Sequence, residues 1–432
     1  MKTKGLLLGA VLLIINSMIF AQGNSALVIE KEYTKEIDKL VKNKRVLKAF
    51  EAIDAMDGKS VEELIYLTEI PAPPFKEEQR AVAFSEMLRS AGADKVWIDE
   101  VGNVLALRKG TKGGRVVALD AHLDTVFPEG TDVKVKMKGD TLLAPGIGDD
   151  TRGLVVVLNV LKAMNEAEIK TEADILIIGS VGEEGLGDLR GVKHIFNTED
   201  LSIDSWISVD GGSIGRITTS GLGSIRYKVT FKGPGGHSWG AFGLGNPHHA
   251  LGYAIRNFDE VAAKFTSEGQ RTSYNVGRIG GGTSVNSIPF ESWMEVDMRS
   301  VSPESLKQID KLFKESMNKG LDEYNNSIKE GPKLEMVLEV IGDRPSGQVE
   351  NNVPLVQRTL ASTKYFGAEP GLSSGSTNSN IPISKGIPSV TIGRGGEGGG
   401  AHSLDEWWLN DKGSEAVKLA LLILCAESTV VK

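Results

Sequence analysis

Short apolar runs alternate with segments of helical periodicity along most of this chain of 432 residues. Apolar runs of this length, bounded by glycine or charged residues, are typical of buried parallel strands. We predict strands at 103–108, 115–121, 173–181, 205–209 and 387–392, and a hairpin at 133–143. Helical spacing predicts helices at 77–91, 151–165, 353–366 and 412–426. This alternation predicts an α/β fold with a mostly parallel sheet.

The pattern changes between residues 221 and 342. We predict strands at 225–231, 273–279, 293–299 and 333–341, with helices at 247–264 and 303–324. The resulting order, β-α-β-β-α-β, is that of a ferredoxin-like α+β unit. Because the α/β pattern lies on both sides of this unit, we predict an inserted domain at 221–342. It divides the main domain into two parts, 59–220 and 343–432.

The N-terminal segments carry different signals. Residues 1–21 have the pattern of a signal peptide, in which two lysines precede an apolar stretch that ends at Ala21. We therefore expect an exported protein, periplasmic or secreted, with no stable membrane anchor after cleavage. Residues 22–58 are charged and predict an N-terminal helical extension. Ser60 and Glu63 have the spacing of a capping box, which predicts that a helix begins there.

Three features argue against common classes of function. The net charge of −8 argues against a nucleic-acid binder, which needs a basic surface. Residues 371–375 match the G-x-S-x-G elbow of serine hydrolases, but the residues before them do not predict a buried strand. Residues 393–398 match G-x-G-x-x-G, but they open no βαβ unit, so a dinucleotide site is not expected.

Acidic and histidine residues follow five of the apolar runs. They are His122, Asp124, Asp149, Asp150, Glu183, Glu184, Asp210 and His402. Loops at the carboxyl ends of parallel strands share one edge of a sheet, where α/β proteins place their ligand sites. Imidazoles and carboxylates together are the ligands that zinc-like ions prefer. Each motif alone is equally consistent with an ordinary turn, but as an ordered set they predict one shared metal site.

The spacing within each motif indicates its chemistry. His122 and Asp124 are two residues apart and point to the same side of a strand, so Asp124 can orient a ligand imidazole. Asp149 or Asp150 can bridge two ions, and spacing alone does not choose between them. Two adjacent acids such as those at 183–184 repel each other unless a cation lies nearby. One of them can bind metal while the other takes a proton from water.

The motifs as a set resemble those of the M20 family of metallopeptidases, especially its peptidase T-like branch. In chain order they are His122-Leu-Asp124-Thr-Val, Gly148-Asp-Asp-Thr-Arg-Gly153, Gly182-Glu-Glu-Gly185, Val209-Asp-Gly-Gly212, Gly235-Gly-His-Ser238 and Ala401-His-Ser-Leu-Asp-Glu-Trp407. One departure is local: the family often has Lys after the paired acids, where this chain has Thr151-Arg152.

The resemblance implies a zinc-exopeptidase-like catalytic domain that holds two zinc ions (Zn2+) per chain, with Co2+ or Mn2+ as alternatives. The implied metal ligands are His122, Asp149, Glu184, Asp210 and His402. Asp149 is preferred over Asp150 as the bridging ligand because Gly153 falls four residues later, as in peptidase T. Glu183 resembles the general base, and Asp124 resembles the acid that orients the first histidine ligand.

The resemblance also implies that the inserted domain serves as a lid and for dimerisation. His237 resembles a histidine that reaches from the lid of a partner subunit to the oxyanion, so a homodimer is expected. Asn286 and Arg299 resemble lid residues that bind a substrate carboxylate. Arg344 matches a further family feature to which we assign no role.

These roles imply a di-zinc exopeptidase that hydrolyses short peptides, with tripeptidase-like aminopeptidase activity as the expectation. A carboxypeptidase or an N-acyl amino acid deacylase would use the same motifs, because the choice among them depends on the walls of the pocket. A non-catalytic peptide-binding protein is a more distant alternative. The presence of Glu183 and of all five predicted ligands argues against it.

Overall fold

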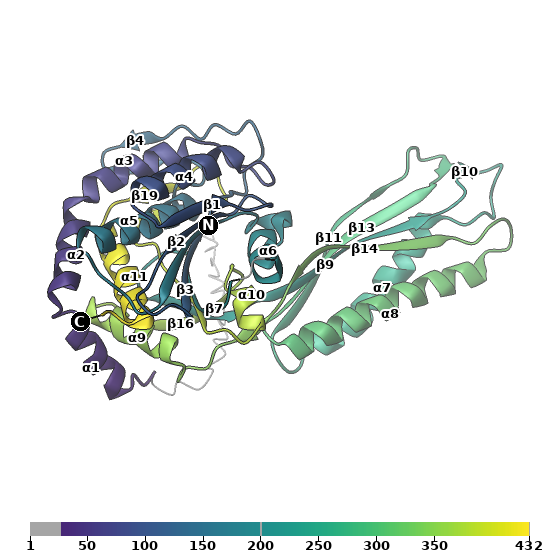
Figure 1. Cartoon of the computed structure of the whole chain (residues 1–432). Coiled ribbons are helices and arrows are strands. Elements are labelled where there is room, and N and C mark those ends of the chain that lie inside the picture. Colours follow the sequence, from purple (N-terminus) through teal and green to yellow (C-terminus); the bar gives the residue numbers. More distant parts are fainter. Residues whose placement is uncertain (1–26, 199–200, 432) are drawn as a thin grey trace, which may run out of the picture.

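The computed structural model describes residues 27–198 and 201–431, so the predicted signal peptide lies outside the described residues. An α/β domain carries an elongated α+β domain that projects away from it (Figure 1). Two hydrogen-bonded strands, β9 (Gly223–Lys232) and β14 (Glu335–Arg344), run from one domain into the other. Within the described residues, no helix combines the length and apolar character needed to cross a membrane.

The α/β domain is built on a nine-stranded sheet with the order β1-β2-β6-β3-β7-β17-β8-β15, in which β16 also pairs with β8. The strands are β1 (Lys95–Ile98), β2 (Val104–Arg108), β3 (Val116–His122), β6 (Asp174–Ser180), β7 (Ile203–Val209), β8 (Arg216–Gly221), β15 (Gly347–Gln348), β16 (Gly371–Gly375) and β17 (Ser389–Ile392). The central strands β6, β3, β7 and β17 are parallel to one another. The predicted α/β fold with a largely parallel sheet is confirmed.

Helices cover this sheet. They are α1 (Lys31–Leu40), α2 (Lys44–Ala55), α3 (Asp57–Thr68), α4 (Glu78–Ser90), α5 (Gly153–Glu166), α6 (Arg190–Thr198), α9 (Pro354–Tyr365), α10 (Asn380–Ser384) and α11 (Gly413–Ser428). Helices α5 and α11 are buried on most of their surface, which explains why their sequences are apolar on nearly every side. The N-terminal helices α1 and α2 bury apolar side chains in the same core as the central strands.

One predicted helix start is wrong. Helix α3 begins at Asp57, so Ser60 lies inside the helix instead of capping it. The Ser60 side chain is buried, and its hydroxyl accepts hydrogen bonds from Asn159 and Arg152. The Ser60 hydroxyl therefore bonds to α5 and to the turn before it, and it does not cap a helix.

The inserted domain has the order β9, α7 (Pro247–Thr266), β11 (Thr272–Gly281), β13 (Glu291–Ser300), α8 (Pro303–Ser327) and β14. Its antiparallel sheet has the strand order β11-β13-β9-β14. Alternate residues of β13 are buried, because one face of the sheet packs against the two helices. This is the predicted ferredoxin-like unit. A short ribbon of β10 (Gly236–His237) and β12 (Ser287–Ile288) lies at its distal end.

A small sheet with the order β18-β19-β5-β4 connects two distant parts of the chain. Its strands are β4 (Lys136–Lys138), β5 (Thr141–Leu143), β18 (Glu397–Gly399) and β19 (Trp407–Leu409). Strands β4 and β5 form the hairpin predicted at 133–143. Because β5 pairs with β19, the turn that follows β5 lies beside the turn that precedes β19.

Candidate active site

The predicted metal ligands come from separate loops that meet at the carboxyl edge of the parallel strands. His122 ends β3, Glu184 follows β6, and Asp210 follows β7. Asp149 lies in the turn after β5, and His402 lies in the turn between β18 and β19. The main sheet therefore positions three of these residues, and the small sheet brings the other two to the same place.

Asp149 lies between two imidazoles. Nε2 of His122 is 3.3 Å from Oδ1 of Asp149, and Nε2 of His402 is 3.3 Å from Oδ2 of the same carboxylate. His402 Nε2 also lies 3.0 Å from Oε1 of Glu184. One ligand atom each of His122, Asp149 and Glu184 lies within 4.8 Å of the others. Each oxygen of Asp149 therefore faces a different histidine, which fits its predicted place at the centre of a metal-binding cluster.

Asp210 belongs to the same electrostatic cluster. Burial and the negative charges of Asp149 and Glu184 together raise the pKa of its carboxyl to about 6, against the lowering effect of His122. Adjacent buried carboxylates repel one another unless a cation balances them. An oxygen and imidazole donor set with excess negative charge fits divalent ions of the zinc type.

Both imidazoles pair with neighbouring acids. Burial opposes the charged form of His122, but hydrogen bonds to Asp124 and Asp149 raise its pKa well above the usual range. Hydrogen bonds to Asp149 and Glu184 raise the pKa of His402 to about 10. Since a metal ligand must be a neutral imidazole, metal binding has to displace these protons.

Asp150 contacts the main chain of His122, and the bond between it and Asp149 is cis. Its side chain is buried, and Oδ2 accepts a hydrogen bond of 3.1 Å from the backbone N–H of His122. The carboxylate fills the space beside Gly153, where an added Cβ would lie 2.3 Å from Asp150 Oδ1. Gly153 is therefore needed so that Asp150 can fold inward while Asp149 faces the histidines.

The carboxylate of Asp124 lies closer to the main chain of the paired acids than to the ring of the first histidine. Its carboxylate accepts the backbone N–H groups of Glu183 at 3.0 Å and Glu184 at 2.8 Å. Nδ1 of His122 lies 2.9 Å from the backbone carbonyl of Asp124 and 3.7 Å from its carboxylate. Nδ1–H thus donates to Asp124, so Nε2 is the nitrogen of His122 that would bind a metal once it has lost its proton.

Comparison with known proteins identifies the family. Residues 118–425 match the sequence profile of Peptidase family M20/M25/M40. The chain belongs to this family. The resemblance drawn from the motifs is confirmed, and the protein is a hydrolytic enzyme of the M20 family with a peptidase T-like fold.

The relatives of this M20 enzyme differ in their activities. It is 25% identical over 313 residues to carboxypeptidase G2 from Pseudomonas sp. (strain RS-16), which covers 70% of this chain and 71% of that protein. It is 27% identical over 218 residues to N-acetylcysteine deacetylase from Bacillus subtilis (strain 168), covering 48% of this chain and 55% of that protein. The crystal structure of aminopeptidase PepT from Bacillus cereus ATCC 10987 has a TM-score of 0.68 at 21% identity, covering 85% of this chain and 97% of that one.

Sequence reasoning gave no role to Glu406, which supports the metal cluster of the M20 enzyme. Its buried carboxylate accepts backbone N–H groups from Gly146 at 2.7 Å, Gly148 at 2.9 Å and Asp149 at 2.8 Å. It thereby connects the turn that carries His402 to the turn that carries Asp149. Its place inside the last histidine motif, four residues after His402, was the only signal in the sequence.

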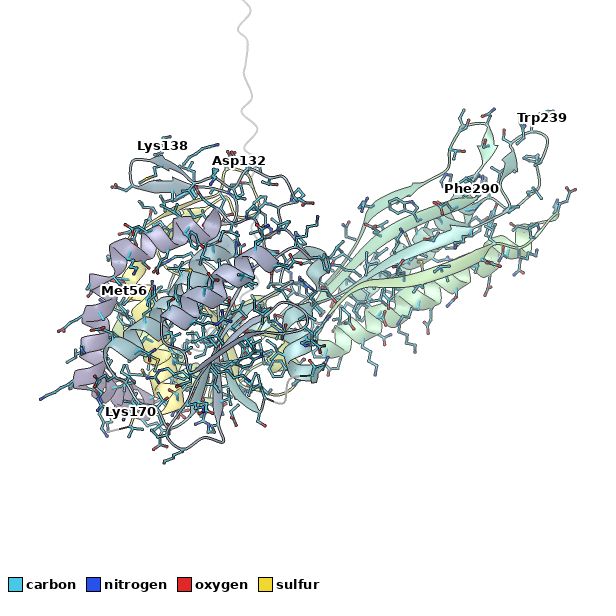
Figure 2. All side chains as sticks on the ribbon, turned by 45° about the horizontal axis from the view of Figure 1, so that its top comes forward. Met56, Asp132, Lys138, Lys170, Trp239 and Phe290 are labelled. Atoms are coloured by element: carbon cyan, nitrogen blue, oxygen red, sulfur yellow. The ribbon has the colours of Figure 1, made fainter. Side chains whose placement is uncertain are left out.

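The structure separates the predicted lid residues of the M20 enzyme. His237 pairs with β12, and the N–H of Ser238 donates to the backbone carbonyl of Asn286 at 2.9 Å. Both lie at the distal end of the inserted domain, since His237 is close in the chain to Trp239 and Asn286 to Phe290, two residues that Figure 2 shows far from the catalytic domain. Arg299 instead pairs with the start of β9, near the junction of the domains, where Nε donates to Asp297 at 2.7 Å.

Proposed function

We propose that this M20 enzyme is a di-zinc exopeptidase that removes residues from the amino terminus of short peptides, in the manner of a tripeptidase. The observation that carries the proposal is the position of Asp149 between two imidazoles, with the paired acids Glu183 and Glu184 beside it. The fold shared with an aminopeptidase supports the choice. Sequence similarity to carboxypeptidase G2 and to a deacetylase favours two alternatives, carboxypeptidase and N-acyl amino acid deacylase.

The residues divide the chemistry between them. Zinc, when bound, would polarise the scissile carbonyl and lower the pKa of the attacking water, so that the water gives up its proton more readily. His122, Asp149, Glu184, Asp210 and His402 would hold the ions. Glu183 would take the proton of the attacking water on its carboxylate and deliver it to the leaving amine. Its burial raises the pKa of the Glu183 carboxyl well above its usual range, which suits a group that must both accept and release a proton.

A second subunit would complete the site. Nδ1 of His237 accepts the backbone N–H groups of Trp239 at 3.2 Å and Gly240 at 3.3 Å, so the proton of a neutral ring resides on Nε2. That exposed N–H can donate to an oxyanion. Because the distal end of the inserted domain lies far from the catalytic domain of its own chain, we propose a homodimer in which each lid serves the partner's site (Figure 2).

A peptide panel tests the substrate class. Zinc-loaded enzyme is incubated with di- and tripeptides that carry free or blocked termini, and with N-acetyl amino acids. The proposal expects hydrolysis only where the amino terminus is free. Cleavage of peptides blocked at the amino terminus selects the carboxypeptidase, and cleavage of N-acetyl amino acids selects the deacylase. Binding without hydrolysis of any compound identifies a peptide-binding protein.

We also propose that the enzyme acts after export, in the periplasm or outside the cell. The support is the signal-peptide pattern of residues 1–21. Amino-terminal sequencing of protein recovered from the periplasm or medium of an expressing bacterium should begin at Gln22. Recovery of the intact amino terminus in the cytoplasm would contradict export.

A further inference from the structure

Arg344 ends β14, one of the two strands that connect the lid to the catalytic domain. It is 5% exposed, and its guanidinium contacts the loop after β6. Nη1 lies 3.3 Å from Oε1 of Glu183 and 3.1 Å from Oγ of Ser376. Nη2 donates to the backbone carbonyl of Glu183 and lies 3.4 Å from that of Gly185. Among the described residues, its hydrogen bonds include none to a proposed metal ligand.

This arrangement fixes Glu183 at two points. One nitrogen of the guanidinium contacts the side chain of Glu183, and the other contacts its main chain. The planar fork of arginine can make both contacts at once, whereas a lysine ammonium is a single point charge. Nη1 donates a hydrogen bond to Oε1 of Glu183. The other carboxylate oxygen, Oε2, therefore remains available to accept a proton.

We propose that Arg344 is a positioning residue for the hydrolytic reaction. It holds the Glu183 carboxylate in the orientation that presents Oε2 to the reacting water. The inference rests on the proposed role of Glu183 as the general base. Displacement of a reacting group by about 1 Å can cost about 100-fold in rate, so a residue that fixes the base can matter as much as one that contacts substrate.

A neighbouring arginine provides a matched control. Arg226 lies in β9, and Nη1 donates to the carbonyl of Gly185 at 3.1 Å while Nε pairs with Asp297 at 2.8 Å. It therefore contacts the same loop from the other connecting strand without a hydrogen bond to Glu183. Arg226→Gln removes a cation and a domain contact but leaves the two contacts of Arg344 in place.

The test compares steady-state kinetics of Arg344→Ala and Arg226→Gln in zinc-loaded enzyme. Arg344→Ala should lower kcat by about 100-fold while KM and zinc content stay within about twofold of wild type. Guanidinium chloride at millimolar concentration should restore part of kcat, and urea should not. Arg226→Gln should keep kcat within about threefold of wild type. A crystal structure of metal-free Arg344→Ala should show Glu183 rotated away from its present position.

Several results would overturn the proposal. An increase in KM with kcat retained would mean that Arg344 binds substrate. An unchanged position of Glu183 in the variant structure would mean that Arg344 does not position it. If Arg344→Ala does not fold, Arg344→Lys replaces it. The ammonium cannot make both contacts, so kcat should fall about tenfold at unchanged KM, and wild-type kcat would refute the idea.

A third variant separates this inference from the proposed function. If Glu183→Gln retains kcat, Glu183 is not the base, and the role of Arg344 is lost with it. If Glu183→Gln abolishes turnover while Arg344→Ala changes only KM, the proposed function stands and the positioning role alone is wrong.

Discussion

Glu406 accepts a hydrogen bond of 2.8 Å from the backbone N–H of Asp149, the residue whose two carboxylate oxygens face two imidazoles. Glu406 lies four residues after His402. Its carboxylate therefore connects the segment that carries His402 to the main chain of Asp149, and both residues are predicted ligands. Supporting contacts of this kind orient metal ligands and are nearly as important as the ligands themselves.

We therefore predict that Glu406→Ala weakens zinc binding about 10- to 100-fold, because the Asp149 turn loses its acceptor. Competition with a chromophoric chelator measures the affinity. Asp405→Ala is the control, since Asp405 is exposed and its neighbour carries the buried contact. Equal zinc affinities for the two variants would show that Glu406 does not support the site.

Removal of the proposed base should separate metal binding from turnover. In Glu183→Gln the five proposed ligands remain, so zinc content measured by atomic emission should equal that of wild type. kcat should fall by at least about 100-fold, the lower end of what a general base contributes. A variant with near-normal kcat would assign proton transfer to another group.

The proposed dimer predicts complementation between two inactive variants. Glu183→Gln and His237→Ala, co-expressed with different tags, form mixed dimers in which one site combines an intact base with an intact lid histidine. If each lid serves the partner's site, random assembly restores about a quarter of wild-type activity.

The controls for complementation use the separately purified variants. Each variant alone should stay inactive, and light scattering should report a dimer for both. Mixed dimers without activity, or a monomer in solution, would show that His237 does not serve the partner's site.

Zinc loading should release protons. Hydrogen bonds to Asp149 and Glu184 raise the pKa of His402 to about 10, so its imidazole is charged near neutral pH before zinc is added. Calorimetric titration with zinc in buffers of different ionisation enthalpy should therefore report release of a proton from His402. That release should vanish above about pH 10. A release of zero near pH 7 would mean that the imidazole of His402 is already neutral.

We predict that the free energy of unfolding depends on pH through Asp120. It lies fully buried in β3, where its carboxylate accepts hydrogen bonds from Ser180 at 2.8 Å, Ser208 at 3.1 Å and Asn378 at 3.0 Å. Burial nevertheless raises the pKa of Asp120 from 3.8 to about 6. Because the folded state binds this proton more tightly than the unfolded state, the stabilisation is present below the unfolded pKa and lost as pH rises through about 6.

Asp120→Asn removes that titration. The free energy of unfolding of wild type, minus that of the variant, should therefore fall by about 2 kcal/mol between about pH 4 and about pH 7. Guanidinium unfolding of both proteins at the two pH values gives the difference. A difference that does not change with pH would show that Asp120 keeps an ordinary pKa in the folded protein.

The sequence by itself determined β2, β3, β6, β7 and β17 of the main sheet, although it did not predict β1, β8, β15 or β16. The apolar runs of β3, β6 and β7 are local signals, because parallel strands buried on both faces need apolar residues at nearly every position. His122, Glu184 and Asp210 lie at or just after the ends of these strands, so their place at one edge of the sheet could be predicted without coordinates.

Only the tertiary structure decided which atoms meet. Arg344 and Glu183 are 161 positions apart, and Glu406 and Gly148 are 258 apart, so no local pattern reports these contacts. The same holds for Ser60, whose hydroxyl bonds to α5 although its spacing predicts a cap. Such contacts depend on how distant strands pair and how side chains pack between them, and packing overrides local preference when a buried polar group needs a partner.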